Sequence, residues 1–202
     1  MLMCFRKSLF AILVVFSYVN SYSQDFDFPD SDTSSLYTGF ASFFLIPTYI
    51  VEGPTIYMGG MGAVLINERF IIGGYGMRKT GQTYVVKGSY DGKMLGMGNG
   101  GIITGYSPYP GKRVRPVFQT CIGWGGISIA SNDSKGYAIT EKFNRIIVLS
   151  PSISADVRLF SFVWLSLGVN YLYLSGIDID GYTPNDFNKF GGYISLKAIT
   201  GN

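Results

Sequence analysis

The feature that most restricts the fold is a strict alternation of side chains in FVWLSLGVNYLYL, residues 162 to 174. Successive side chains of a β-strand point to opposite faces, so this stretch predicts a strand with one apolar face and one face carrying Ser166, Gly168 and Asn170. Residues 145 to 158 repeat the pattern, with serines alternating with isoleucine, leucine or alanine. Both stretches are longer than the roughly five or six residues of an ordinary strand. They suit the ~9–11 residues of a tilted membrane strand whose apolar side chains face outward.

Turn-forming residues divide the rest of the chain into apolar stretches of similar length. We expect eight strands, at about 37–50, 54–66, 69–79, 93–106, 114–127, 145–157, 161–175 and 187–198. Short links fall at 66–69, 107–113 and 158–161, with one more at 51–54, and long polar links at 80–92, 128–144 and 176–186. Short turns at one rim and long loops at the other are typical of outer-membrane barrels. The sequence therefore predicts an all-β fold, an eight-stranded antiparallel up-and-down transmembrane β-barrel.

Composition agrees with an exterior that faces lipid. Only 14% of the residues are charged, whereas about a quarter are charged in a typical soluble domain. Beyond the first 23 residues no run of 18 apolar residues occurs, which excludes a helical membrane protein. A chain embedded in lipid must then form a closed barrel, because only helices and barrels satisfy every backbone polar group there.

The N-terminus has the pattern of a secretory signal peptide. Arg6 and Lys7 precede a continuous apolar stretch, and small residues follow it. We expect a signal peptide at 1–23, a flexible acidic leader at 24–36 and the barrel at 37–199. Cleavage removes two of the 16 basic residues, against 13 acidic ones, so the mature chain is nearly neutral. A nucleic-acid partner would need a concentrated basic face, and we expect none.

Glycines and aromatic residues have expected places in such a barrel. An eight-stranded barrel has an interior just wide enough for side chains, so inward glycines should make room for large residues opposite. We expect this role for Gly59, Gly73, Gly74, Gly76, Gly96, Gly98 and Gly101. Aromatic girdles lie at the lipid interfaces of membrane barrels. We expect Tyr106, Trp124, Trp164, Tyr171, Tyr173 and Tyr193 to form them.

Histidine is absent from the chain, which excludes histidine-dependent hydrolysis and imidazole-bound zinc. We expect no catalytic residue, no cofactor and no metal site. Asp178, Asp180 and Asp186 share one loop, but the other ligands of a calcium loop are missing. Charged residues gather near the short-turn rim, and Asp156 and Arg158 occupy inward positions there. We expect these two to pair as a structural polar plug rather than to form a binding site.

Three segments carry a resemblance to known proteins: TGFASFFL, MGGMGAVLINERFIIGGYGM and PSISADVRLFSFVWLSLGVNYLYLSG. From about Tyr37 to Ile199, the chain resembles the small outer-membrane β-barrel proteins, the superfamily that includes the transmembrane domain of outer membrane protein A. In detail it looks like an uncharacterised barrel family common in Bacteroidota. The resemblance implies the outer membrane as location, contact with its lipid and assembly by the barrel-assembly machinery. Such barrels commonly end on an aromatic residue, whereas this sequence ends KAITGN.

Two functions remain open at this stage. The first is a non-enzymatic integral outer-membrane protein with a structural or surface-interaction role, its partners bound at loops 80–92, 128–144 and 176–186. The second is a soluble exported barrel of the lipocalin kind that binds an apolar ligand. The second predicts a polar exterior and an apolar interior, the reverse of the alternation in 145–158 and 162–174. An enzyme that uses only carboxylates, such as Asp156 with Glu68, is a weaker third possibility.

Overall fold

The computed structural model describes residues 37–50, 53–81, 83–132 and 138–200. The expected signal peptide and acidic leader lie outside the described residues, as do Val51 and Glu52 of the expected link 51–54. These expectations therefore remain predictions. No helix in the described part of the chain is long and apolar enough to cross a membrane.

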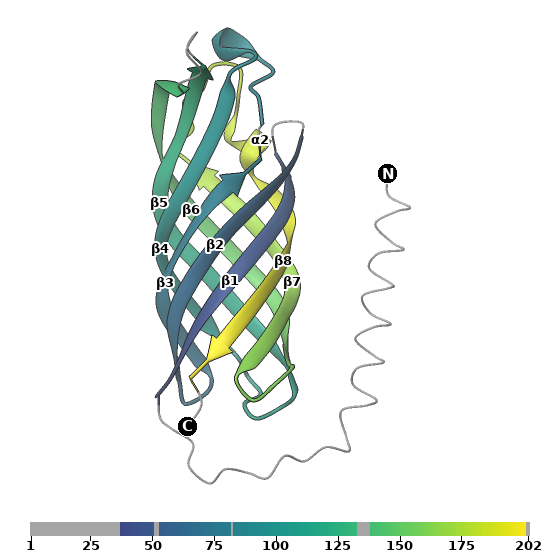
Figure 1. Ribbon diagram of the computed structural model, residues 1–202. Coiled ribbons are helices and arrows are strands. Elements are labelled where there is room, and N and C mark those ends of the chain that lie inside the picture. Colours follow the sequence, from purple (N-terminus) through teal and green to yellow (C-terminus); the bar gives the residue numbers. More distant parts are fainter. Residues whose placement is uncertain (1–36, 51–52, 82, 133–137, 201–202) are drawn as a thin grey trace.

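Eight antiparallel strands follow one another in sequence order around a closed barrel (Figure 1). The last strand pairs with the first, from Phe40 opposite Ile199 to Thr48 opposite Gly191. The prediction of an all-β, eight-stranded antiparallel barrel is confirmed. The strands are β1 (Tyr37–Ile50), β2 (Gly53–Ile66), β3 (Phe70–Thr80), β4 (Met94–Tyr106), β5 (Val114–Asn132), β6 (Ala138–Arg158), β7 (Val163–Ser175) and β8 (Lys189–Ile199).

The two rims differ as the lengths of the links predict. One rim, here called the short-turn rim, carries the connections 67–69, 107–113 and 159–162. At its β2–β3 turn, Asn67 and Glu68 both have positive φ, and the N–H of Arg69 donates to the carbonyl of Ile66 at 3.1 Å, which closes the turn. The other, the loop rim, carries longer segments that include a 3₁₀ turn, η1 (Gly88–Tyr90), and a short helix, α2 (Pro184–Phe187).

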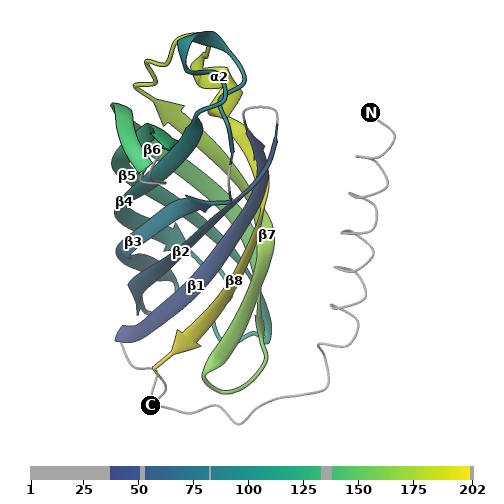
Figure 2. The same ribbon diagram turned by 45° about the horizontal axis from the view of Figure 1, so that its top comes forward.

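The expected loop at 128–144 is wrong for most of its length. β5 continues to Asn132 and β6 begins at Ala138, so the two strands extend beyond their neighbours as a paired ribbon (Figure 2). The register shifts at Ile129/Ala130, where the ribbon begins to separate from the barrel. A ribbon beyond the barrel has no buried face to impose alternation, and therefore its polar sequence is typical of a loop.

Inward glycines make room for large side chains at two places. A Cβ on Gly59 would lie 2.6 Å from the Phe44 ring, and one on Gly123 would lie 2.6 Å from the Tyr75 hydroxyl. Both distances are too short, so the large residue requires the glycine opposite it.

Only some of the expected glycines have this role. Gly74, Gly76, Gly96 and Gly98 occupy the outward positions of their strands, where they make no room inside the barrel. At Gly76 an added Cβ would meet nothing within 4 Å. Glycine at this position is therefore not explained by interior packing.

Candidate functional site

In the half of the barrel nearer the short-turn rim, the inner wall is polar along β5 to β8. At one level Arg115 lies opposite Asp156, Asp156 opposite Ser166 and Ser166 opposite Ser195. Arg115 and Asp156 are buried, as are both serines. Since side chains of directly opposed residues lie on the same face of a sheet, these four form a continuous polar row inside the barrel.

A second row lies next to it, closer to the short-turn rim. Arg158 is opposite Trp164, and Trp164 is opposite Lys197. Lys197 is in turn opposite Ser42 of β1. The two rows place four charged groups from three strands, β5, β6 and β8, in one cluster, which we call the interior charged cluster: Arg115, Asp156, Arg158 and Lys197.

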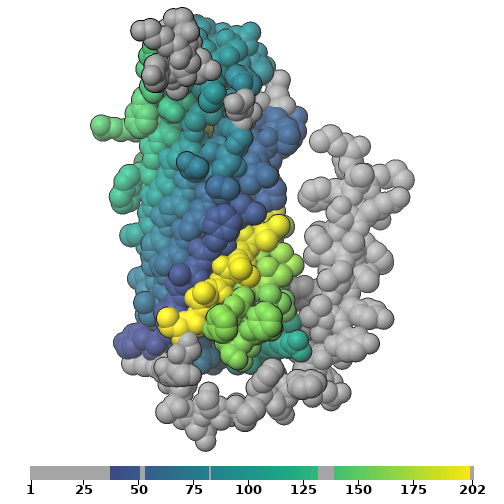
Figure 3. All heavy atoms as spheres, viewed as in Figure 1, coloured from purple at the N-terminus to yellow at the C-terminus, as the bar shows by residue number. Residues whose placement is uncertain are grey.

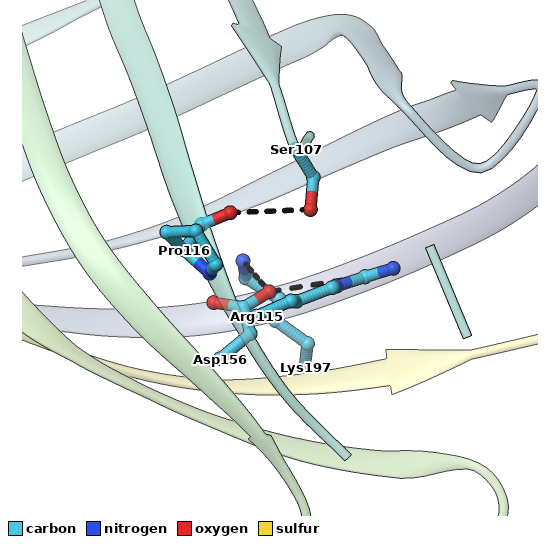
Figure 4. A network of polar contacts seen from close by, with 5 residues as sticks. All are labelled: Ser107, Arg115, Pro116, Asp156 and Lys197. Carbon is cyan, nitrogen blue, oxygen red and sulfur yellow. Dashed lines mark hydrogen bonds and ion pairs between the residues drawn. The ribbon is translucent and has the colours of Figure 1, made fainter. Parts of the chain in front are cut away.

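Asp156 is the central acceptor of the interior charged cluster (Figure 4). Lys197 Nζ donates a hydrogen bond to Asp156 Oδ2 at 2.7 Å, and Arg115 Nη2 lies 3.9 Å from the same oxygen. Nearby, the Ser107 hydroxyl donates to the carbonyl of Pro116 at 3.2 Å. The side chains of Asp156 and Lys197 are only 1% and 2% exposed, so their ion pair is shielded from the screening that weakens surface pairs.

Arg158 stacks on an aromatic ring inside the barrel. Its guanidinium carbon is 4.8 Å from the centre of the Trp164 ring, and that of Arg115 is 4.1 Å from the same centre. The sequence predicts that Asp156 and Arg158 pair with each other in the interior. In the structure, Asp156 instead forms ion pairs with Lys197 and Arg115, and Arg158 contacts the Trp164 ring. The structural plug remains a proposal, with Arg115, Lys197 and Trp164 added to it.

The expected position in an aromatic girdle is wrong for two residues. Trp164 and Tyr193 are each 3% exposed and occupy inward positions, because Trp164 packs on two guanidinium groups and Tyr193 packs against Phe44. Trp124, Tyr106 and Tyr173 are exposed.

Many buried polar atoms near the interior charged cluster have no hydrogen-bond partner among the described residues. They include Nε of Arg115 and Arg158, Oδ1 of Asp156 and the hydroxyls of Ser154, Ser166 and Ser195. Unsatisfied polar groups are costly in a dry interior. This part of the barrel is therefore suited to hold water or a polar ligand.

The interior toward the loop rim is apolar and covered. Ile50, Tyr57, Leu95, Ile127 and Leu174 are buried there. Above them the segments 83–93 and 176–188 fold onto each other, with Val85, Ile179 and Phe187 buried between them and the barrel. We call these two segments together the cap. It closes the loop-side interior with side chains instead of leaving an open cup.

Hydrogen bonds connect the two halves of the cap. The backbone N–H and the hydroxyl of Ser89 both donate to Asp180 Oδ2, at 3.1 and 2.7 Å. The N–H of Val86 donates to the Tyr182 hydroxyl at 2.9 Å. The hydroxyl and the N–H of Ser89 hold the pKa of Asp180 below its ordinary value. The ionised form of Asp180 therefore stabilises the cap.

The other aspartates of the cap also have partners within the protein. Asp178 accepts a hydrogen bond from Lys142 at 3.3 Å, and Asp186 accepts one from the N–H of Thr183 at 2.7 Å. The described residues contain no group of side chains that could hold a metal ion. Each of these aspartates is instead hydrogen-bonded to a residue of the protein.

We expect Asp180→Asn to loosen the cap, so that trypsin cleaves within 83–93 several times faster than in the parent protein at neutral pH. Lowering the pH should have the same effect, measured with pepsin. A carboxylate with a depressed pKa stabilises fully above its unfolded value, about 3.9, and this stabilisation is lost as the pH falls through the lower folded value. Asp91→Asn, in the same loop, is the control, and equal cleavage of the two variants would contradict the proposed clamp.

Comparison with known proteins supports the fold and no more. No family model matches the chain, and no curated protein matches it. Among solved structures, Neisserial surface protein A (NspA) is 12% identical with a TM-score of 0.55, and covers 81% of this chain and 97% of its own. The N-terminal β-barrel domain of Pseudomonas aeruginosa OprF is 8% identical with a TM-score of 0.52 and the same coverage. The chain therefore has the closed eight-stranded fold of these small bacterial barrels, which confirms the resemblance seen in the sequence at the level of fold.

Proposed function

We propose that the protein is a non-enzymatic integral barrel of the outer membrane that presents its loop rim as an interaction surface. The observation that carries this proposal is the polarity of the wall. Large apolar side chains cover the outside, among them Ile72, Ile102, Phe118, Ile122, Ile147, Ile153, Leu167, Val169 and Leu196, all at least two-fifths exposed. A monomeric soluble protein rarely exposes so large an apolar surface.

Aromatic pairs on the outer wall support the placement in a bilayer. At the short-turn rim the rings of Phe70 and Tyr106 lie 5.1 Å apart. At the loop-side ends of β7 and β8, the rings of Tyr171 and Phe190 lie 4.7 Å apart. Outward aromatic residues near both ends of the strands suit the two interfacial girdles of a membrane barrel.

The same polarity argues against the soluble lipocalin-like alternative. A soluble barrel needs a polar exterior and an open apolar cup. Here the exterior is apolar, the interior of β5 to β8 is polar nearer the short-turn rim, and the cap fills the loop-side end. An apolar ligand would first have to displace Val85, Ile179 and Phe187.

The cap and the ribbon supply the proposed interaction surface. Tyr84 and Val86 are each almost half exposed on the cap. Lys93 forms an ion pair with Glu141 of β6 and lies over the Tyr90 ring, which joins the cap to the ribbon. A surface held in one conformation loses less entropy when a partner binds. We propose that the partner binds across the expected loops 80–92, 128–144 and 176–186.

The test is the electrophoretic mobility of protein extracted from the membrane fraction, with and without boiling. We expect the unboiled protein to migrate differently, because a closed barrel with every strand paired resists the detergent of the gel. Recovery in the soluble fraction without a mobility shift would contradict the membrane placement and would favour the lipocalin-like alternative.

A further inference from the structure

Positive charge exceeds negative charge in the interior charged cluster. Arg115, Arg158 and Lys197 are cationic, while Asp156 is the one carboxylate of the cluster. Glu68, half-buried in the β2–β3 turn, is close enough for its charge to act on Arg115. Even with both carboxylates counted, the described residues of the cluster carry one more positive than negative charge, with Arg115 and Lys197 buried and Arg158 half-buried.

A buried charge is stable only with a counter-ion or with water beside it, because its transfer from water to the protein interior is unfavourable. The side chains of Arg115 and Lys197 are 5% and 2% exposed, and water can therefore solvate them only from inside the barrel. Asp156 Oδ2 already accepts from Lys197, and the same oxygen lies 3.9 Å from Arg115 Nη2. One carboxylate oxygen thus serves two cations, and Arg158 has an aromatic ring in place of an anion.

Donors that could hold an anion surround this excess charge. The Nε–H groups of Arg115 and Arg158 are buried and have no partner among the described residues. The hydroxyls of Ser166 and Ser195, on the same inner wall, are also buried and have no hydrogen-bond partner among the described residues. Guanidinium groups and hydroxyls are the groups that bind halides and small oxyanions in proteins.

We propose that the interior charged cluster binds one small inorganic anion, of the chloride or phosphate type, inside the barrel. The anion lies among Arg115, Arg158 and Lys197 and supplies the missing negative charge. It enters from the short-turn rim, since the opposite end is closed by apolar side chains and the cap. The site concerns the interior only and does not depend on which partner the loop rim binds.

The experiment is the thermal unfolding of the purified protein in detergent at constant ionic strength, with sodium gluconate replaced stepwise by sodium chloride. Gluconate is a much larger anion than chloride and serves as the reference anion. We expect the unfolding midpoint to rise and then saturate, by roughly 5–10 °C at a chloride concentration a hundredfold above the dissociation constant. A midpoint that is unchanged, or that rises without saturating, would overturn the proposal.

Variants locate the effect. Arg158→Gln and Arg115→Gln should abolish the chloride-dependent rise, whereas Arg113→Gln, an exposed arginine of the 107–113 turn, should keep it. If Arg115→Gln does not fold, Arg158→Gln tests the site alone. In addition, the parent protein should broaden the NMR signal of chloride, and phosphate should reverse this broadening. An equal rise in Arg158→Gln, or no broadening, would refute the site.

A further variant tests the other source of negative charge in the chain. Asp25, Asp27, Asp30 and Asp32 precede β1, outside the described residues. A chain with all four changed to asparagine should show the same chloride dependence as the parent protein. A chloride effect that appears only in this variant would mean that the chain's own carboxylates fill the site, and would overturn the proposal.

Discussion

Replacement of Asp156 by alanine lowers the free energy of unfolding by about 3–5 kcal/mol, the range for removal of one partner of a buried ion pair. The change leaves Lys197 without its 2.7 Å acceptor and Arg115 without the carboxylate oxygen at 3.9 Å. Both cations would remain inside the barrel. The measurement is urea unfolding of the protein in lipid vesicles, followed by tryptophan fluorescence, and an unchanged midpoint would contradict the role of Asp156.

A second substitution separates the lost pair from the lost volume. Asp156→Ala combined with Lys197→Met removes both charges of their buried ion pair, so the double variant should recover part of the lost stability. Asp156→Asn is the isosteric control, because it keeps the size of the side chain while removing its charge. If the double variant were as unstable as the sum of the single ones, the two residues would act independently.

The second large effect is expected at Gly73 on β3. A Cβ at this inward position would overlap the carbonyl oxygen of Gly62 and lie 2.5 Å from both Cα and Cβ of Ala63. The obstacle is mostly backbone of the neighbouring strand, which cannot rotate away. We therefore expect Gly73→Ala to lower the free energy of unfolding by about 3 kcal/mol, at the upper end for overpacked interiors.

Gly76, on the same strand, is the matched control. It occupies an outward position where an added Cβ meets nothing within 4 Å. Gly76→Ala should be neutral or stabilise the protein by about 0.5–1 kcal/mol, since glycine weakens a strand interior. Both variants are measured by urea unfolding in the same vesicles. Equal effects of the two substitutions would show that glycine occupies these positions because of backbone flexibility and not because of the space available inside the barrel.

Alternation and link length together were sufficient to predict the barrel. On β6, the outward residues Leu149, Pro151 and Ile153 alternate with buried Ser150, Ser152 and Ser154. A pattern with period two indicates a strand with one face inside the barrel. The glycines were only partly predictable. The sequence shows a glycine at both 73 and 76. Only the register of β3 in the barrel shows that Gly73 faces the interior and Gly76 faces outward.

The partners within the interior charged cluster were even less predictable from the sequence. Asp156 and Arg158 share one face of one strand, so the sequence alone could pair them. Lys197 is 41 residues from Asp156 and becomes its partner because β8 lies two strands away across a narrow barrel. From the sequence Trp164 is expected to be an interfacial aromatic residue, and its contact with two guanidinium groups depends on the same cross-strand geometry.

The pairing of β1 with β8 has a consequence for the order of events in biogenesis. Gly39 of the first strand accepts a hydrogen bond from the N–H of Thr200, the residue after the last strand. Contacts between such distant parts of a chain form slowly, and until they form, two strand edges are open to aggregation. The seam cannot be completed during synthesis, so the chain needs protection from other unfolded chains until residue 200 has arrived.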